Sequence, residues 1–135
     1  RIELVQGDAE SAAYGREAFD AATVAFGVRN FEHLELGLQE MYRVLKTGGK
    51  VIILEFSMPE HFPMKQLYRF YFCHILPTIG GWISGNKGAY TYLPESVMKF
   101  PQGETFLQIM RDCGFQHPVR RKLSFGIASL YVGEK

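Results

Sequence analysis

Charged and amide side chains stand at three points of the sequence where a predicted strand ends. Asp8 follows the first of these strands, Arg29 and Asn30 follow the second, and Glu55 lies at the end of the third. A carboxylate accepts hydrogen bonds, and a guanidinium in a water-poor site stabilises negative charge that develops during a reaction. Open α/β sheets bind ligands in the crevice beyond the carboxyl ends of their strands, so these side chains are the first candidates for a site.

Hydrophobic patterning predicts the elements that must position these residues. Residues 2–6 have the short, β-rich character of a strand, and residues 19–26 form an almost continuous apolar run, typical of a strand buried on both faces. Apolar side chains recur at helical spacing over 33–46, a pair of glycines follows as a stop signal, and residues 50–56 form a further apolar strand. Strand, helix and strand with short connections predict a right-handed βαβ unit in a parallel sheet.

The second half of the sequence is richer in aromatic residues and ends in strand-like segments. Two prolines bracket an aromatic stretch and mark the ends of a predicted helix, and the last two strands are close enough to pair as an antiparallel hairpin. The expected elements are a helix between Pro63 and Pro77, a loop over 80–88, helices over 94–100 and 104–113, and strands over 116–123 and 127–133. The predicted class is therefore α/β, with a mixed sheet that ends in an antiparallel hairpin.

Composition limits the class of protein. The 135 residues, 47% of them hydrophobic, suffice for one compact domain. A net charge of +1, from 15 basic and 14 acidic residues that are interspersed, gives no basic footprint, so no nucleic-acid partner is expected. The 2 cysteines and 4 histidines show no metal-ligand spacing, which predicts reduced thiols, a cytoplasmic protein and no metal site. No apolar run approaches the ~18 residues of a membrane span, and the strand-like start without methionine predicts a missing upstream segment.

Four short motifs, read together, resemble one family of enzymes. They are Gly-Asp-Ala-Glu at 7–10, Phe-Gly-Val-Arg-Asn at 26–30, Met-Tyr-Arg-Val-Leu-Lys-Thr-Gly-Gly-Lys at 41–50 and Leu-Glu-Phe-Ser at 54–57. Their order and spacing resemble the class I S-adenosylmethionine-dependent methyltransferases, and the second and fourth motifs narrow the resemblance to the ubiquinone/menaquinone C-methyltransferase family. Similar residues at 74–77, 90–96 and 113–115 extend it over essentially the whole chain.

The resemblance implies methyl transfer from S-adenosyl-L-methionine to a ring carbon of a polyprenylated benzoquinol or naphthoquinol. It also implies a partial Rossmann-like class I fold, without the N-terminal strands and the Gly-rich loop. In this family the position of Asp8, with the Ala9 backbone, meets the adenine, although Asp8 could merely cap a turn. The segment with Ala25, Phe26 and Gly27 matches the strand end beside the methionine portion, and Ala25 replaces a common hydroxyl residue, so only a backbone contact is expected there.

Candidate catalytic and substrate-binding residues follow from the same resemblance. C-methylation needs an electron-rich ring, so a base should take the hydroxyl proton, and Arg29 is expected to stabilise the resulting quinolate. His74, whose helical neighbours are aromatic, is the candidate base; the alternatives are a salt bridge for Arg29 and a core position for His74. The substrate-binding candidates are Asn30, Tyr71, Tyr90 and Tyr92. Asn30 could instead cap the following helix, and the tyrosines could simply pack.

Within a single methyltransferase domain over 1–135, residues 58–100 are expected to form a substrate-side lid or insertion, with ordinary core packing as the alternative. The lid would receive the isoprenoid tail, and its aromatic helix could rest on lipid. We therefore expect peripheral contact with the inner face of the membrane, and a homo-oligomer is a further expectation. Two other functions stay open: a fragment without independent activity that acts as a binding or assembly module, and a methyltransferase for another small molecule.

Overall fold

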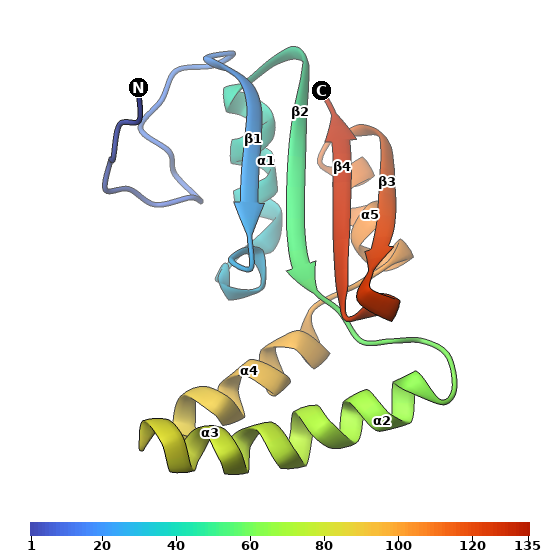
Figure 1. Cartoon of the computed structure of the whole chain (residues 1–135). Coiled ribbons are helices and arrows are strands. Elements are labelled where there is room, and N and C mark those ends of the chain that lie inside the picture. The colour runs from blue at the N-terminus through green and yellow to red at the C-terminus, as the bar shows by residue number, and fades with distance from the viewer.

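A computed structural model describes residues 1–135 of the chain, except for the side chain of Lys87. A four-stranded sheet in the order β1-β2-β4-β3 forms its centre (Figure 1). The strands are β1 (Phe19–Ala25), β2 (Leu45–Phe56), β3 (Gln116–Leu123) and β4 (Ala128–Glu134). β1 and β2 are parallel, whereas β4 is antiparallel to both of its neighbours. The carboxyl ends of β1 and β2 therefore lie at the same edge of the sheet.

Two helices cover one face of this sheet. Helix α1 (Leu34–Val44) makes the crossover between β1 and β2, and α5 (Glu104–Asp112) precedes β3 (Figure 1). Side chains from both helices join those of β2 and β4 in a single core that includes Leu38, Val51, Ile53, Phe106, Met110 and Tyr131. Each fully buried side chain of this size contributes roughly 1.5–3 kcal/mol, so this core fixes the strand ends that carry the candidate site.

A helical hairpin lies beyond the carboxyl ends of β1 and β2 (Figure 1). Its first arm is a continuous rod of α2 (Met64–Phe70), the π-helical turn η2 (Tyr71–Ile75) and α3 (Leu76–Ser84). Gly85 takes the left-handed conformation at φ 70° and ends α3, after which α4 (Lys87–Lys99) returns beside the rod. None of the described helices is long and apolar enough to cross a membrane.

The βαβ unit and the final hairpin are confirmed, but the predicted strand over 2–6 is wrong. These residues are exposed and irregular, because no strand in the described part of the chain offers them a hydrogen-bonding partner. β1, the nearest strand in sequence, pairs with β2 alone among the described strands. The β-rich composition of residues 2–6 cannot form a strand without such a ladder.

The predicted loop over 80–88 is also wrong, as are two helix boundaries. Pro77 directly follows the π-helical turn η2, in which the Leu76 N–H bonds to the Tyr71 carbonyl five residues back, and the rod continues past the proline. The Asn86 side chain accepts a hydrogen bond from the Ala89 N–H at 3.3 Å and caps α4, which therefore starts at Lys87 and contains Pro94. The Asn86 cap sets the start of α4, whereas the spacing of proline and glycine in the sequence predicted the wrong boundaries.

Replacement of Gly49 by alanine should destabilise the fold. A Cβ at this buried position of β2 would stand 2.8 Å from the Lys46 carbonyl oxygen and 3.0 Å from the Asp20 carbonyl oxygen. Backbone atoms cannot move aside as a flexible side chain can, so we expect Gly49→Ala to lower the free energy of unfolding by about 2 kcal/mol in urea titrations.

Gly15→Ala is the matched control, because a Cβ at position 15 meets nothing within 4 Å. Its effect should stay within about 0.5 kcal/mol. Equal losses in the two variants would contradict the packing constraint at Gly49.

Candidate active site

A buried ion pair joins the carboxyl ends of β1 and β2. Arg29 Nη1 lies 2.7 Å from Glu55 Oε1, and the two side chains are 10% and 0% exposed. Glu55 follows Val51 and Ile53 at alternate positions of β2 and thus faces the helix-covered side of the sheet, where a lone charge would be costly. The Arg29 backbone N–H donates to Glu55 Oε2 at 3.2 Å, and the Phe56 N–H donates to Oε1 at 2.9 Å, which completes the solvation of the carboxylate.

The turn after β1 aims Arg29 at this carboxylate. Phe26 has φ 56°, in the left-handed region, and its N–H donates to the Leu54 carbonyl at 2.8 Å. The chain then enters the short 3₁₀ turn η1 (Val28–Asn30), and Arg29 Nη1 also donates to the Phe26 carbonyl at 2.6 Å. The Phe26 and Phe56 rings lie 4.4 Å apart between centroids. The motif residues of two strands therefore form one compact unit.

Helix α4 closes over this unit through two further hydrogen bonds. Arg29 Nε donates to Ser96 Oγ at 3.3 Å, and the Tyr92 hydroxyl donates to Asn30 Oδ1 at 2.9 Å. The structure thus brings together three of the predicted residues, Arg29, Asn30 and Tyr92. Asn30 does not cap α1, whose first turn receives no side-chain cap.

A cavity of about 260 Å³ opens where α4 crosses η1. Arg29 and Tyr92 line it together with Glu95, Ser96 and Lys99 of α4, and apolar walls are provided by Val28, Phe31, Leu34, Phe100 and Pro101. A few convergent polar groups on apolar walls are typical of small-molecule sites. The cavity could hold one ring of a ligand beside the guanidinium.

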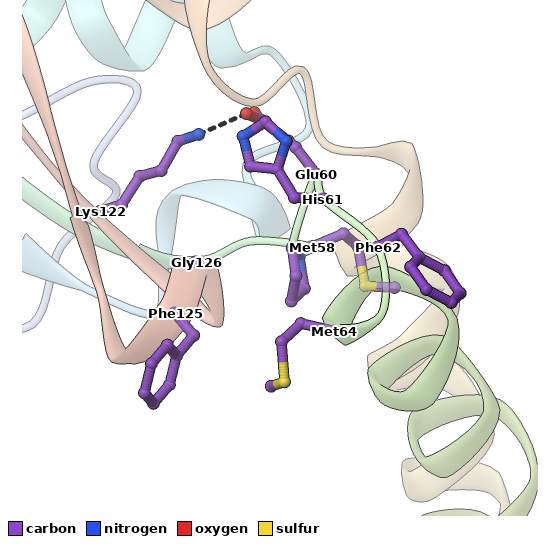
Figure 2. A pocket seen from close by; sticks show the side chains of 9 residues that line it. Met58, Glu60, His61, Phe62, Met64, Lys122, Phe125 and Gly126 are labelled. Atoms are coloured by element: carbon purple, nitrogen blue, oxygen red, sulfur yellow. Dashed lines mark hydrogen bonds and ion pairs between the residues drawn. The ribbon is translucent and has the colours of Figure 1, made fainter.

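A larger hollow, of about 400 Å³, lies where β2 leads into residues 58–100, the predicted lid (Figure 2). Its walls are mainly apolar and come from the segment after β2 and from the turn between β3 and β4, with Met58, Phe62, Met64 and Phe125. Figure 2 shows Phe62 and Phe125 on opposite sides of the hollow and Glu60 paired with Lys122 at its edge. Sequence reasoning missed this hollow, because its two walls lie far apart in the sequence and share no motif.

Glu60 anchors the start of the lid to the hairpin of β3 and β4. Its carboxylate pairs with Arg120 at 2.7 Å and with Lys122, and hydrogen bonds from these two side chains lower the pKa of Glu60 to about 2. Arg120 Nε donates in turn to Ser129 Oγ at 2.9 Å, which lies 2.9 Å from Ser57 Oγ. This chain of polar groups, buried at Ser57 and Ser129, links Glu60 to the end of β2, and no sequence motif indicated it.

Hydrogen bonds hold the segment before β1 against α1 and the residue that precedes it, and Asp8 lies in a turn of this segment. Asp8 Oδ1 accepts a hydrogen bond from the Glu10 N–H at 2.9 Å. In the structure Asp8 therefore caps a turn, which is the alternative given for it in the sequence analysis. Glu10 Oε1 accepts the His33 N–H at 2.7 Å, and Arg43 Nη2 donates to the Ala12 carbonyl at 3.1 Å. Asp8 and Ala9 are exposed and leave room for a ligand, and their contact with adenine stays a prediction.

The remaining candidates lie away from Arg29. The His74 ring is exposed and rests 5.3 Å from the Phe70 ring, and Tyr71 is exposed on the same rod. Tyr90 packs its ring against Gly80 of α3. No described contact brings these three residues to the ion pair, so their catalytic and substrate roles stay predictions. Among the described residues, no group of three or more His, Cys, Asp or Glu is arranged to hold a metal ion.

A family model described as the ubiE/COQ5 methyltransferase family matches residues 1–135. A demethylmenaquinone methyltransferase of Bacteroides fragilis is 46% identical over 135 residues, which cover 100% of this chain and 55% of that protein. A demethylmenaquinone methyltransferase of Deinococcus radiodurans is 49% identical over 134 residues, or 99% and 55% of the two chains. A ubiquinone/menaquinone biosynthesis C-methyltransferase UbiE of Geobacter sulfurreducens is 46% identical, with 100% and 52% covered. The chain spans about half the length of these curated relatives.

Solved structures of low sequence identity share the fold. A SAM-dependent methyltransferase of Thermotoga maritima, described as a possible histamine N-methyltransferase, superposes with a TM-score of 0.68 at 21% identity, covering 99% of this chain and 64% of that one. PigF with SAH gives 0.65 at 20% identity, with 100% and 36% covered. These likenesses confirm the predicted partial class I methyltransferase fold.

Removal of the buried carboxylate should cost far more stability than removal of a surface one. Glu55→Gln leaves Arg29 buried without its counter-charge, and we expect the free energy of unfolding to fall by about 3 kcal/mol. Glu104→Gln is the matched control, because Glu104 also pairs with an arginine at 2.7 Å but is 75% exposed. It should change stability by under about 0.5 kcal/mol. Comparable losses in chemical denaturation would show that the Arg29–Glu55 pair does not hold the site together.

The Glu60 ion pairs should give a distinct acid dependence. Because pairing lowers the folded pKa from 4.5 to about 2, the stabilisation is fully present above pH 4.5 and is lost as the pH falls towards 2. Glu60 is partly exposed, so the effect at neutral pH should be about 1 kcal/mol. Wild type and Glu60→Gln should therefore differ in stability at pH 6 and converge near pH 2. A difference that stays constant over this range would contradict the assignment.

Proposed function

Because the chain belongs to the ubiE/COQ5 methyltransferase family, we propose that it forms part of an enzyme that methylates a ring carbon of a polyprenylated quinol. The substrate would be a demethylmenaquinol or its benzoquinol equivalent. The observation that carries the proposal is the assembly of the family motifs at 26–30 and 54–57 into one buried unit around Arg29 and Glu55. The relatives named demethylmenaquinone methyltransferase support the same substrate class.

We propose S-adenosyl-L-methionine as the cofactor, which when bound supplies the electrophilic methyl group. Ala25, Phe26 and Gly27 would lie beside its methionine portion, at the end of β1. Asp8 and Ala9 would meet the adenine, since the turn holds the exposed carboxylate in one orientation and it can accept an exocyclic amine. The left-handed backbone conformation of Phe26 supports its proposed place beside the methionine portion, because sparsely populated backbone conformations are concentrated at ligand sites.

Arg29 is the proposed catalytic residue, in a role that the ion pair modifies. Glu55 neutralises one side of the guanidinium, so the residual positive field at the cavity is weaker than that of a free arginine. Glu55, Ser96 and the Phe26 carbonyl hold the Arg29 guanidinium in a fixed position. The guanidinium therefore offers a preorganised dipole to a quinolate oxygen. Asn30 and Tyr92 would orient the ring from the same side.

The hollow lined by Met58 and Met64 suits the apolar tail of such a substrate, since flexible thioether side chains adapt to irregular ligands. Residues 58–100 would then act as the lid. No described contact joins His74 or Tyr71 to the unit around Arg29, so Arg29 is the first residue to test. A substrate with a polyprenyl tail resides in a bilayer, and we therefore also propose peripheral membrane contact for a cytoplasmic protein. Self-association stays an untested expectation.

The test is a methyl-transfer assay with the full-length protein and isotopically labelled S-adenosyl-L-methionine. Demethylmenaquinol and its benzoquinol analogue are offered separately, and mass spectrometry locates the label. We expect one labelled methyl on a ring carbon of at least one quinol. Label on neither quinol would refute the proposal, and label on a hydroxyl oxygen would point to a different methyltransferase.

Arg29→Lys tests the role of the guanidinium in the same assay. Lysine keeps the charge but loses the forked geometry that contacts Glu55, Ser96 and Phe26 together, so kcat should fall at least about tenfold. The Kd for S-adenosyl-L-methionine should change by less than about threefold, because Arg29 lies on the substrate side. Arg111→Lys, on the surface of α5, is the matched control and should leave both constants unchanged. Equal losses in kcat and cofactor affinity would remove Arg29 from the chemical step.

A further inference from the structure

The segment before β1 has no apolar core of its own. Residues 1–18 include no buried residue, and only Glu10 and Ala12 among them are half-buried. Figure 1 shows this segment as an open loop at the side of the sheet. Its position therefore depends mainly on polar contacts, since it buries little apolar surface. Asp8 and Ala9, the proposed adenine contacts, lie in this segment, so the same polar contacts decide where they stand.

Glu40 and Arg43 of α1 hold one residue of this segment from both sides. Glu40 Oε1 accepts a hydrogen bond from the Ala12 N–H at 3.0 Å, and Arg43 Nη2 donates to the Ala12 carbonyl at 3.1 Å. The two side chains also pair with each other, at 2.6 Å between Arg43 Nη2 and Glu40 Oε1 and at 2.9 Å between Arg43 Nε and Glu40 Oε2. We call the arrangement of Glu40, Arg43 and the Ala12 backbone the clamp.

The clamp differs from an ordinary ion pair on a helix surface. The side chains of Glu40 and Arg43 are only 17% and 26% exposed. The hydrogen bond from Arg43 lowers the pKa of Glu40, and the Ala12 N–H lowers it further, so the carboxylate is charged at neutral pH. A pair three residues apart can stabilise its own helix without any partner in another segment. The two hydrogen bonds to Ala12 therefore point to a role outside α1.

A short turn connects the clamp to Asp8. The Asp8 carbonyl accepts the Ser11 N–H at 3.1 Å, and Asp8 Oδ1 accepts the Glu10 N–H at 2.9 Å, so the turn ends one residue before Ala12. Glu10 Oε1 accepts the His33 N–H at 2.7 Å, which gives the turn a second anchor at the start of α1. Within the described part of the chain no group donates to Asp8 Oδ2, so this oxygen is free for a ligand.

We propose that Glu40 and Arg43 are positioning residues for the cofactor, because the clamp holds the turn with Asp8 and Ala9 where it can meet the adenine ring. The inference rests on the adenine contact proposed above and adds the residues that aim it. Both residues act through the Ala12 backbone. A hydrogen bond weakens steeply with distance and angle, so a turn that is no longer held would lose its recognition of the exocyclic amine first.

Selectivity for the base separates this role from a purely structural one, which would weaken all ligands alike. The full-length protein is titrated by calorimetry with S-adenosyl-L-homocysteine and with S-inosyl-L-homocysteine, in which a carbonyl oxygen replaces the exocyclic amine. We expect the wild type to bind the first ligand at least about tenfold more tightly, because the Asp8 carboxylate would meet an acceptor in the second. Glu40→Ala with Arg43→Ala should reduce this ratio to below about threefold.

Glu104→Ala with Arg111→Ala is the matched control. It removes the same pair of residue types, which lie 2.7 Å apart on α5, and the described hydrogen bonds of the Arg111 side chain stay within that helix. The control should keep the wild-type ratio. Glu40→Gln is a milder variant that keeps an oxygen for the Ala12 N–H and loses the charge. Its ratio should lie between those of the wild type and the double alanine variant of the clamp.

Hydrogen exchange in the ligand-free protein tests the clamp without any cofactor. The Ala12 amide donates to Glu40, so its exchange should become at least about tenfold faster when Glu40 and Arg43 are replaced by alanine. The control on α5 should change this rate by less than about twofold.

Several outcomes would overturn the inference. Unchanged exchange at Ala12 would show that the clamp does not hold the segment. Faster exchange with an unchanged ligand ratio would leave the clamp without effect on adenine recognition, and an equal fall of the ratio in the control would trace the effect to general stability. A wild type without base selectivity would remove the adenine contact of Asp8 and this inference with it, whereas methyl transfer to the quinol by the same protein would leave the proposed function standing.

Discussion

The buried pair of Arg29 and Glu55 is the interaction on which the candidate site depends. The core side of β2 continues past Ile53 to Glu55, and a carboxylate at that position must find a counter-charge because water cannot reach it. Arg29 supplies the charge only if β1 ends in the left-handed turn at Phe26 and β1 and β2 keep their parallel register. One electrostatic requirement therefore fixes the geometry of two strand ends and, through Ser96, the approach of α4.

Residues 58–100, the proposed lid, are held at their two ends by polar contacts of different kinds. At the start, the carboxylate of Glu60 meets two cations of β3, and the Met58 backbone exchanges two hydrogen bonds with the Gln102 side chain. At the end, Ser96 and Tyr92 meet the Arg29 unit. The hydrogen bonds described between the lid and the sheet thus cluster at its ends, and the rod between them packs on α4. The polar contacts at the two ends and the packing on α4 are compatible with the proposed role of residues 58–100 as a lid.

The sequence predicted the parts of the fold that depend on local pattern. The run of β1 was correctly predicted as a strand, but its predicted burial on both faces is wrong, since every residue of this edge strand is exposed or half-buried. The helical period of α1 and the hairpin of β3 and β4 were predicted correctly, and the motifs identified Arg29, Asn30 and the segment around Phe26. Glu55 was identified at the end of its strand, but Arg29 could not be assigned as its partner, because that contact depends on the register between two strands. The prediction of a strand over 2–6 was wrong because a strand needs a neighbouring strand to pair with. Glu60 and Ser96 were missed because their partners are distant in sequence.

The apolar side chains of the rod fall into two groups. One row, with Phe72, is buried and makes the hairpin with α4, so stability accounts for it. The others, with Trp82 and Ile83, are exposed. A side chain that stays in water gains nothing from folding, so stability does not account for these residue types.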